Sequence, residues 1–281
     1  MTYKTILAVL DSPRNTAQVA DFAISLSRDF DAHLIGLHAE TLASVALVAP
    51  MEIPDPVAIQ ALQDMAQADT AEVGRIYKER QSLAGVSAEW RGLSSAAGYS
   101  GTTVIDAART ADLIIAGQGN PEHPTDGWRD LESFLFDSGR PVLLIPYILK
   151  EPKPVRRVLI AWNGSKEAAR ATFDALPFLK AADSVEILSV STSEKDPHPS
   201  KETGVQIAAA LTRHGVRAKF ETTACSGKST PSQVIENRLA DNSIDLLVMG
   251  AYTHSWLWQM IFGGTTRTLL QSMTAMTLLA R

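Results

Sequence analysis

The most constraining feature of this sequence is a short apolar segment that occurs twice. Residues 112–117 are Asp-Leu-Ile-Ile-Ala-Gly, and residues 245–250 are Asp-Leu-Leu-Val-Met-Gly. An apolar run of this length that ends in glycine predicts a buried parallel strand. Earlier in each copy another apolar run ends in a polar residue, Asp11 in the first and Asn163 in the second. The pattern indicates one β-α unit that is repeated along the chain.

Strands and helices alternate through both copies. Strands are predicted at 4–10, 33–39, 86–93, 112–117 and 141–147, and again at 155–162, 184–190, 218–223, 245–250 and 275–279. Helices are predicted at 14–28, 57–80, 103–109 and 131–136, and again at 166–179, 202–214 and 232–240. This alternation predicts parallel sheets with right-handed crossovers. We expect two tandem, open, doubly wound α/β domains, residues 1–150 and 151–281, joined near Pro152 and Pro154.

The two copies differ in length for a reason that the sequence shows. Asp11 and Asn163 are 152 residues apart, whereas Gly117 and Gly250 are 133 apart. Residues 41–56 of the first copy include three prolines and predict a long irregular excursion, followed by a longer second helix.

Composition excludes several classes of protein. Of the 281 residues, 45% are hydrophobic and 20% charged, which is typical of a globular chain with a sizeable core. The net charge of −5 gives no reason to expect binding to nucleic acid or to an anionic membrane. The single cysteine, Cys225, excludes an intrachain disulfide. With neither a signal-peptide pattern nor a membrane-spanning apolar run, we expect a cytoplasmic protein.

The last 37 residues contain the pattern of an anion site. After the strand at 245–250 come a loop at 251–262, the turn Gly263-Gly264-Thr265-Thr266 and an apolar-periodic segment that predicts a helix. Free backbone N–H groups and the positive end of a helix dipole favour phosphate at such a turn. The alternative is a tight strand-to-helix turn that binds nothing. The second copy is the more basic, with 15 Lys/Arg against 12 Asp/Glu, compared with 11 against 19 in residues 1–150.

On these residues the chain resembles the universal stress protein family. That family's C-terminal signature, Gly-x2-Gly-x9-Gly-Ser/Thr, holds the phosphates and ribose of ATP. Gly250 and Gly263 fall on its first and third glycines. Thr253 stands where the second glycine belongs, Gly264 stands where Ser/Thr belongs, and Thr265 is one place late. If position 253 needs a positive φ, the Cβ of a threonine would crowd the phosphates there.

The resemblance covers nearly the whole chain and implies a fold. It implies the Rossmann-like, adenine nucleotide alpha-hydrolase-like form with strand order 3-2-1-4-5 in each domain. The chain is similar to the tandem form of the family, in which two domains make a pseudo-dimer within one chain. The fifth strands, 141–147 and 275–279, would then pair and protect each other's edges. The assembly could also include a homodimer.

The resemblance also implies which residues border the nucleotide. Asn163 stands where the family has an Asp near the adenine and ribose, and its amide can both donate and accept. The alternative to a ligand contact is that Asn163 belongs to a turn, in which Asn163 or Ser165 caps the next helix. Val190 would form an apolar wall for the base, or it is simply a core residue. Met249 and Gly250, at the end of their strand, would also border the nucleotide. Gly263 to Thr265 would hold phosphates.

The first copy lacks most of these features. Asp11 is present, but no Gly-Ser/Thr helix start follows Gly117. Five acidic residues in this stretch would repel phosphate: Glu122, Asp126, Asp130, Glu132 and Asp137. We expect a first domain that has lost nucleotide binding, although another small molecule could bind near Asp11 and Asn120.

Other motifs point to no chemistry. Residues 227–230 are Gly-Lys-Ser-Thr, but a P-loop also needs glycine at the position of Thr222. Cys225 has no histidine near it in sequence, and the six histidines show no metal-ligand spacing. There is no Gly-x-Ser-x-Gly elbow. Slow ATP hydrolysis would have only His254 as a candidate base in the second-copy loop.

Two functions of different classes remain open. The first is a non-enzymatic, stress-linked protein that binds and senses ATP or a related adenine nucleotide through its second domain. The second is an interaction or scaffold module that does not bind nucleotide. In that case the loop containing Trp256 and Trp258 would contact a protein partner.

Overall fold

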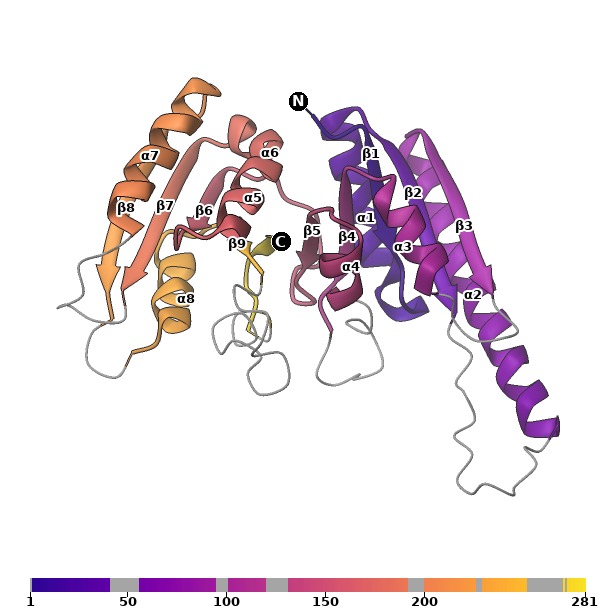
Figure 1. Ribbon diagram of the computed structural model, residues 1–281. Helices are drawn as coiled ribbons and strands as arrows, with labels where there is room; N and C mark the ends of the chain where they lie inside the picture. The colour runs from indigo at the N-terminus through magenta and orange to yellow at the C-terminus, as the bar shows by residue number, and fades with distance from the viewer. Residues whose placement is uncertain are drawn as a thin grey trace, which may run out of the picture.

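The protein is built around one continuous sheet. A computed structural model describes residues 2–40, 56–94, 101–119, 131–191, 200–225, 229–251, 270 and 272–281. The sheet has ten strands in the order β3-β2-β1-β4-β5-β10-β9-β6-β7-β8. Figure 1 shows the first five strands on one side of the molecule and the last five on the other.

The elements lie close to the predicted segments. The strands are β1 (Thr5–Val9), β2 (His33–Glu40), β3 (Ala88–Ser94), β4 (Leu113–Gly117), β5 (Val142–Ile145), β6 (Arg157–Ala161), β7 (Ser184–Ser191), β8 (Ala218–Ala224), β9 (Leu246–Gly250) and β10 (Met276–Ala280). The helices are α1 (Pro13–Phe30), α2 (Pro56–Ala84), α3 (Gly101–Arg109), α4 (Leu131–Asp137), α5 (Lys166–Asp174), α6 (Leu176–Ala181), α7 (Ser200–Arg213) and α8 (Pro231–Asp241).

Strand pairing confirms the predicted order. Each half of the sheet is parallel and reads 3-2-1-4-5 when its strands are numbered within the half. The fifth strands meet in the middle, where β10 pairs antiparallel with β5 and Leu278 lies opposite Leu143. Among the strands that the structure describes, this pairing leaves only β3 and β8 as edges, and so confirms that the two fifth strands protect each other.

Two aspartates begin the fourth strands in the same way. Asp112 Oδ2 accepts hydrogen bonds from the backbone nitrogens of Lys4 at 2.8 Å and Thr5 at 3.0 Å. Asp245 Oδ2 accepts from those of Arg156 at 3.0 Å and Arg157 at 2.8 Å. Each carboxylate thus ties the start of its half's fourth strand to the start of the first. The repeat therefore extends from the sequence pattern to individual hydrogen bonds.

Two helices depart from the prediction. The single helix expected at 166–179 is two helices, because α5 ends at Asp174 and α6 begins at Leu176. Pro177 has no backbone N–H and its ring crowds the carbonyl four residues earlier, so it starts a new helix instead of continuing α5. The expectation of a longer second helix is confirmed, with 29 residues in α2 against 14 in α7.

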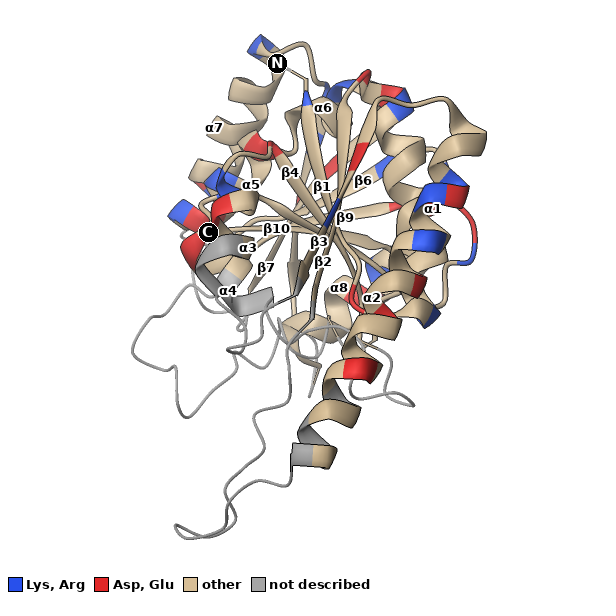
Figure 2. Ribbon diagram, turned by 90° about the vertical axis from the view of Figure 1, so that its right-hand side faces the viewer, with Lys and Arg blue, Asp and Glu red and all other residues tan. Residues whose placement is uncertain are grey.

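Helices cover both faces of the sheet. Core residues of α1, α2, α5, α6 and α7 pack on one face. Those of α3, α4 and α8 pack on the other, together with Leu270 and Met273. In Figure 2 the strands are almost all tan, and the blue and red segments lie chiefly on the helices and at the strand ends. Burial on both faces explains why the strands are continuous apolar runs.

Side chains join the halves beyond the central strands. The rings of Tyr3 and Phe30 each lie within 5.6 Å, centroid to centroid, of Phe178 in α6. Tyr3 also donates a hydrogen bond to the carbonyl of Asp174 at 2.5 Å. Buried Gln118 donates from Nε2 to the carbonyl of Leu270 at 2.8 Å. These contacts connect residues at least 148 positions apart in the sequence.

Candidate functional site

The strand order of the second half contains a topological switch point, where ligands bind in open α/β sheets. Order reverses between β6 and β9, because the chain continues from β6 to β7 on one side and returns to β9 on the other. At their carboxyl ends Ala161 lies opposite Met249. In open α/β sheets, ligands bind beyond the carboxyl ends of the strands at such a switch point. Asn163, Met249 and Gly250 from the sequence analysis all lie at this place.

The residues after β6 form a tight turn that starts α5. Gly164 has φ +76°, a value that side chains rarely tolerate. Asn163 Oδ1 accepts a hydrogen bond from the backbone nitrogen of Ser165 at 3.1 Å. Ser165 is the N-cap of α5 and accepts from the nitrogen of Ala168 at 3.1 Å. Asn163 is exposed, so its side chain is accessible beyond the end of β6.

Two of the predicted residues lie on one face of the sheet. Met249 is 6% exposed and belongs to the core cluster on the α8 side, and half-buried Val190 packs against the same cluster. Ala161 lies between their strands, opposite Met249 in β9 and opposite Leu188 in β7. The sheet therefore presents apolar side chains on both sides of the end of β6. Only Val190 is open enough to offer a ligand a substantial surface.

Gly250 has a packing requirement of its own. A Cβ built there would lie 2.5 Å from the backbone nitrogen of Ala168 and 2.6 Å from the carbonyl carbon of Glu167. Backbone atoms of a helix cannot move aside as a side-chain end can, so the first turn of α5 excludes any side chain at this position. Gly250 therefore lets α5 pack closely against the end of β9. This contact is on the face of the sheet opposite to the one that carries the Met249 side chain.

A buried carboxylate that the sequence analysis did not single out lies beside Gly250. Glu167 is 2% exposed and occupies the first turn of α5. Its Oε1 lies 3.6 Å from Nζ of exposed Lys166. A negative side chain near a helix N-terminus complements the helix dipole, and here it opposes a second anion at the start of α5. The only available signal was an acidic residue two places after the cap Ser165.

Much of the predicted phosphate site lies outside the described residues. This holds for Thr253, Gly263, Gly264 and Thr265, and equally for His254, Trp256, Trp258 and Asn120. Leu270 and Met273, predicted on the following helix, are both buried on the α8 side of the sheet. Leu270 is helical as predicted, whereas Met273 is not in a helix.

The matching crevice of the first half has different chemistry. His38, at the end of β2, is 1% exposed, and its Nδ1 lies 2.5 Å from the carbonyl oxygen of Leu10. Since a carbonyl only accepts, Nδ1 carries the proton. Buried Gln118 follows Gly117, where the second half has Ala251 after Gly250. Register places His38 where the second half has Ser189. The two crevices therefore differ in the side chains beside equivalent strand ends.

Other sequence motifs have structural roles or none. Thr230, at the end of the Gly-Lys-Ser-Thr run, is the N-cap of α8 and forms a capping box with Gln233. Cys225 is half-buried. Within the described ranges, no three His, Cys, Asp or Glu side chains gather as metal ligands do. In the same part of the chain, none of the helices has the length and apolarity to cross a membrane.

Comparison with protein families finds a match in the second half of the chain. The model of the universal stress protein family matches residues 154–281. A curated relative, universal stress protein Slr1230 from Synechocystis sp. (strain ATCC 27184 / PCC 6803 / Kazusa), is 27% identical over 164 residues. The alignment covers 57% of this chain and 54% of the relative, so the chain spans about half the length of the curated relative that it matches.

Solved structures share the fold over the whole chain. A universal stress protein from Archaeoglobus fulgidus DSM 4304 superposes with a TM-score of 0.70 at 17% identity, covering 98% of this chain and 96% of that one. A chain from Pseudomonas aeruginosa UCBPP-PA14 gives a TM-score of 0.56, also at 17% identity, with coverage of 99% and 93%. At these identities the likeness shows the fold, and it extends over both halves.

Proposed function

Because the chain is a UspA-like protein of the universal stress protein family, we propose that it binds and senses ATP or a related adenine nucleotide through its second half. Membership of the family supports a stress-related function. The nucleotide would occupy the crevice beyond β6 and β9. The observation that carries the proposal is the reversal of strand order at this point, with exposed Asn163 at its mouth.

The described residues suit the base and ribose. The Asn163 side chain has an NH₂ group that can donate to a ring nitrogen or a ribose hydroxyl while its oxygen holds the turn. Half-buried Val190 offers an apolar surface on the neighbouring strand. Met249 closes the wall on the other side of β6. These three positions combine one polar group with an apolar wall, as small-molecule sites usually do.

The phosphates would be held away from α5. Glu167 places a buried carboxylate at the N-terminus of that helix, so this helix start is unsuited to a second negative group. The remaining anion site is the turn of Gly263, Gly264 and Thr265, whose backbone N–H groups and hydroxyl would hold the phosphates. Thr253 would border the same site.

Isothermal titration calorimetry with ATP tests this function. We expect saturable binding by the intact chain. Asn163→Ala should weaken it about tenfold, the effect of losing a hydrogen bond or two to a ligand. The matched control is Asp11→Ala at the equivalent strand end, which should leave the affinity unchanged. A Thr265→Ala variant should lower affinity for ATP more than for adenosine, because its hydroxyl is assigned to phosphate.

A second function is favoured by one observation. Gly250 is required by its contact with the backbone of α5, so the first glycine of the nucleotide signature is explained without any ligand. Under this alternative the chain is an interaction module without nucleotide, and the loop containing Trp256 and Trp258 contacts a protein partner. Absence of ATP retention at millimolar concentration in equilibrium dialysis would reject the nucleotide proposal and leave this alternative. A loss of binding in Asp11→Ala that is absent from Asn163→Ala would instead move the site to the first half.

A further inference from the structure

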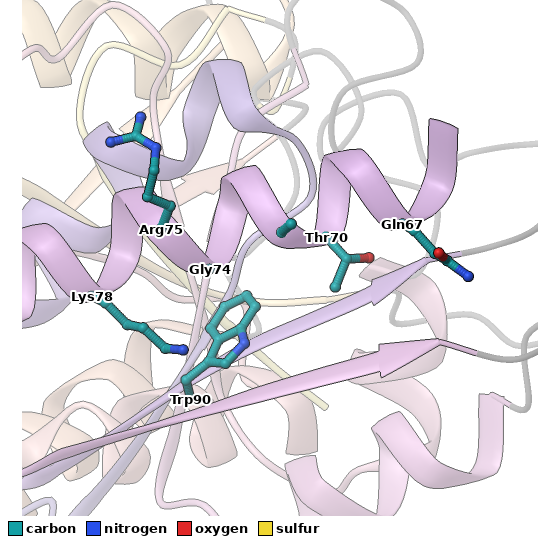
Figure 3. Close-up of a pocket in the computed structure, with 7 residues that line it drawn as sticks. Gln67, Thr70, Gly74, Arg75, Lys78 and Trp90 are labelled. Atoms are coloured by element: carbon teal, nitrogen blue, oxygen red, sulfur yellow. The ribbon is translucent and has the colours of Figure 1, made fainter. Parts of the chain in front are cut away.

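A groove on the outer flank of the first half, far from the nucleotide crevice, has the features of a binding site. It lies between α2 and the edge strand β3, with a volume of about 530 Å³. Figure 3 shows Trp90 beneath the helix, with Thr70, Gly74 and Lys78 around its ring. Its wall is mainly apolar, and it is lined by Gln67, Thr70, Ala71, Gly74, Arg75, Lys78 and Trp90.

The floor of this groove is a packing unit that the second half repeats. A Cβ on Gly74 would come within 3.0 Å of the Trp90 ring, and one on Gly204 of α7 would overlap the ring of Phe220 in β8. Both glycines lie 16 residues before their aromatic partners. In each half, therefore, an aromatic side chain of the third strand lies directly on a glycine of the preceding helix.

The polar groups of the groove are not needed for this packing. At the spacing of 130 residues that relates the two units, Arg75 and Lys78 of α2 correspond to Val205 and Ala208 of α7. Phe220 has no counterpart of the Trp90 indole N–H. The second half packs its aromatic ring with neither a cation nor an indole. The fold of the first half therefore does not require Lys78 or the indole N–H of Trp90.

Lys78 is the positive group that remains available in the groove. Arg75 is already engaged, since its guanidinium lies 2.7 Å from Glu72 and 3.1 Å from Glu79. Its hydrogen bond lowers the pKa of Glu72. Over the described ranges, no carboxylate forms an ion pair with Lys78, and no group accepts a hydrogen bond from Trp90 Nε1. The lining residues include no acid. The groove thus combines an aromatic wall, two free donors and one uncompensated positive charge.

We propose that this groove binds a small planar apolar molecule carrying a carboxylate. The body of the ligand would lie along Ala71 and the part of the Trp90 ring that Gly74 leaves uncovered. Its carboxylate would accept from Lys78, and the exposed Gln67 amide lies at the end of the groove toward the start of α2. This site is independent of the nucleotide crevice, because it is formed by α2 and β3 of the other half.

Indole-3-acetate is a suitable probe, and its neutral amide, indole-3-acetamide, is the matched control for charge. The chain has five tryptophans, so ¹H–¹⁵N spectra should show five indole N–H signals. A Trp90→Phe variant assigns the Trp90 signal by its loss, and Phe220 shows that phenylalanine suits the packing. We expect indole-3-acetate to shift the Trp90 signal saturably, and indole-3-acetamide to bind about tenfold more weakly.

The variant Lys78→Met separates charge recognition from packing. It should weaken indole-3-acetate about tenfold and leave indole-3-acetamide unchanged, because it keeps the apolar stem and removes the ammonium group. Lys180→Met, on α6, is the control and should change neither affinity. The proposal is overturned if the Trp90 signal does not move up to about 10 mM indole-3-acetate, a concentration that would detect even a millimolar Kd. Equal affinity for acid and amide, or full affinity in Lys78→Met, would overturn it as well.

Discussion

The two halves share one fold but differ in how closely a helix approaches the end of the fourth strand. A Cβ on Gly117 would meet side-chain atoms, Val19 Cγ2 at 3.1 Å and Asn15 Nδ2 at 3.4 Å. A Cβ on Gly250 would meet helix backbone at 2.5 Å. The glycine is thus close to optional in the first half and required in the second, although the two sequences around it look alike.

The cause lies in the helix and not in the strand. With the spacing of 152 residues between Asp11 and Asn163, Val19 of α1 corresponds to Ala171 of α5. Both are fully buried, but alanine lets α5 come closer to the sheet than valine allows α1 to come. The same glycine therefore has different consequences, because the neighbouring helix carries a smaller side chain.

Substituting these two glycines should give the largest contrast. Gly250→Ala should lower the free energy of unfolding by about 2–3 kcal/mol, because α5 must shift to admit the methyl group. Gly117→Ala should cost less than about 1 kcal/mol, since the ends of Val19 and Asn15 can rotate away. Urea denaturation followed by circular dichroism measures both. Equal losses would show that the two helices approach the sheet equally closely.

Gln118 has no counterpart in the second half, where Ala251 stands. Gln118→Leu should cost about 2 kcal/mol, because the carbonyl of Leu270 and the nitrogen of Tyr147 lose their bonds of 2.8 and 3.2 Å inside the core. Gln18→Leu is the matched control, since half-buried Gln18 donates to the carbonyl of Pro146 at 2.9 Å and also to that of Leu149. It should cost less than about 1 kcal/mol in the same urea experiment, because water can replace both bonds at this half-buried position. A Gln118 effect no larger than that of Gln18 would contradict the role of Gln118 as a buried link between the halves.

The two helix glycines should differ in the sign of their effect. Alanine gains about 0.5–1 kcal/mol over glycine within a helix. At Gly204 the overlap with Phe220 should exceed this gain and give a net loss of about 1–2 kcal/mol. At Gly74 the Trp90 ring stands 3.0 Å away and can yield, so Gly74→Ala should be close to neutral. Thermal unfolding of both variants measures the difference. Adding Phe220→Leu should restore the stability lost in Gly204→Ala and should not stabilise Gly74→Ala.

The smallest expected effect concerns pH and Asp174 in α5, whose counterpart in α1 is Phe22. Burial raises the pKa of the Asp174 carboxyl, and its hydrogen bond with Arg170 only partly offsets this. A raised pKa in the folded state means that this group's contribution to stability is fully present below the ordinary carboxyl pKa of about 3.9 and is lost as pH rises through the folded value. The stability of the native chain relative to Asp174→Asn should therefore fall as pH rises from about 4. A difference that stays constant with pH would show that burial does not perturb this carboxyl.

The sequence predicted the strands well because their signal is local. Runs such as 113–117 and 246–250 are buried on both faces and continuous in apolar character, so neighbouring residues alone identify them. The break between α5 and α6 was missed, although Pro177 was visible. Apolar periodicity continues across that break, and a proline near the start of a helix is compatible with either interpretation.

The candidate site was predictable only in part. The end of β6 and its opposite residue Met249 follow from strand order, which the repeat and the family resemblance implied. The role of Gly250 in packing did not, because the atoms that exclude a side chain belong to α5, more than 80 residues away in the chain. Buried Glu167 beside it was equally hidden, since a glutamate in a first helical turn is usually exposed.

The repeated pattern of apolar runs and polar strand ends determined by itself that this chain forms two parallel α/β units in series. Hydrophobic periodicity is a property of consecutive residues, so it can be recognised without knowing the fold. Only the tertiary structure decided how near each helix lies to its sheet, which glycine is obligatory and where an aromatic side chain borders a cationic groove. Those features depend on distances between atoms that the chain brings together from far apart, and a one-dimensional pattern does not contain such distances.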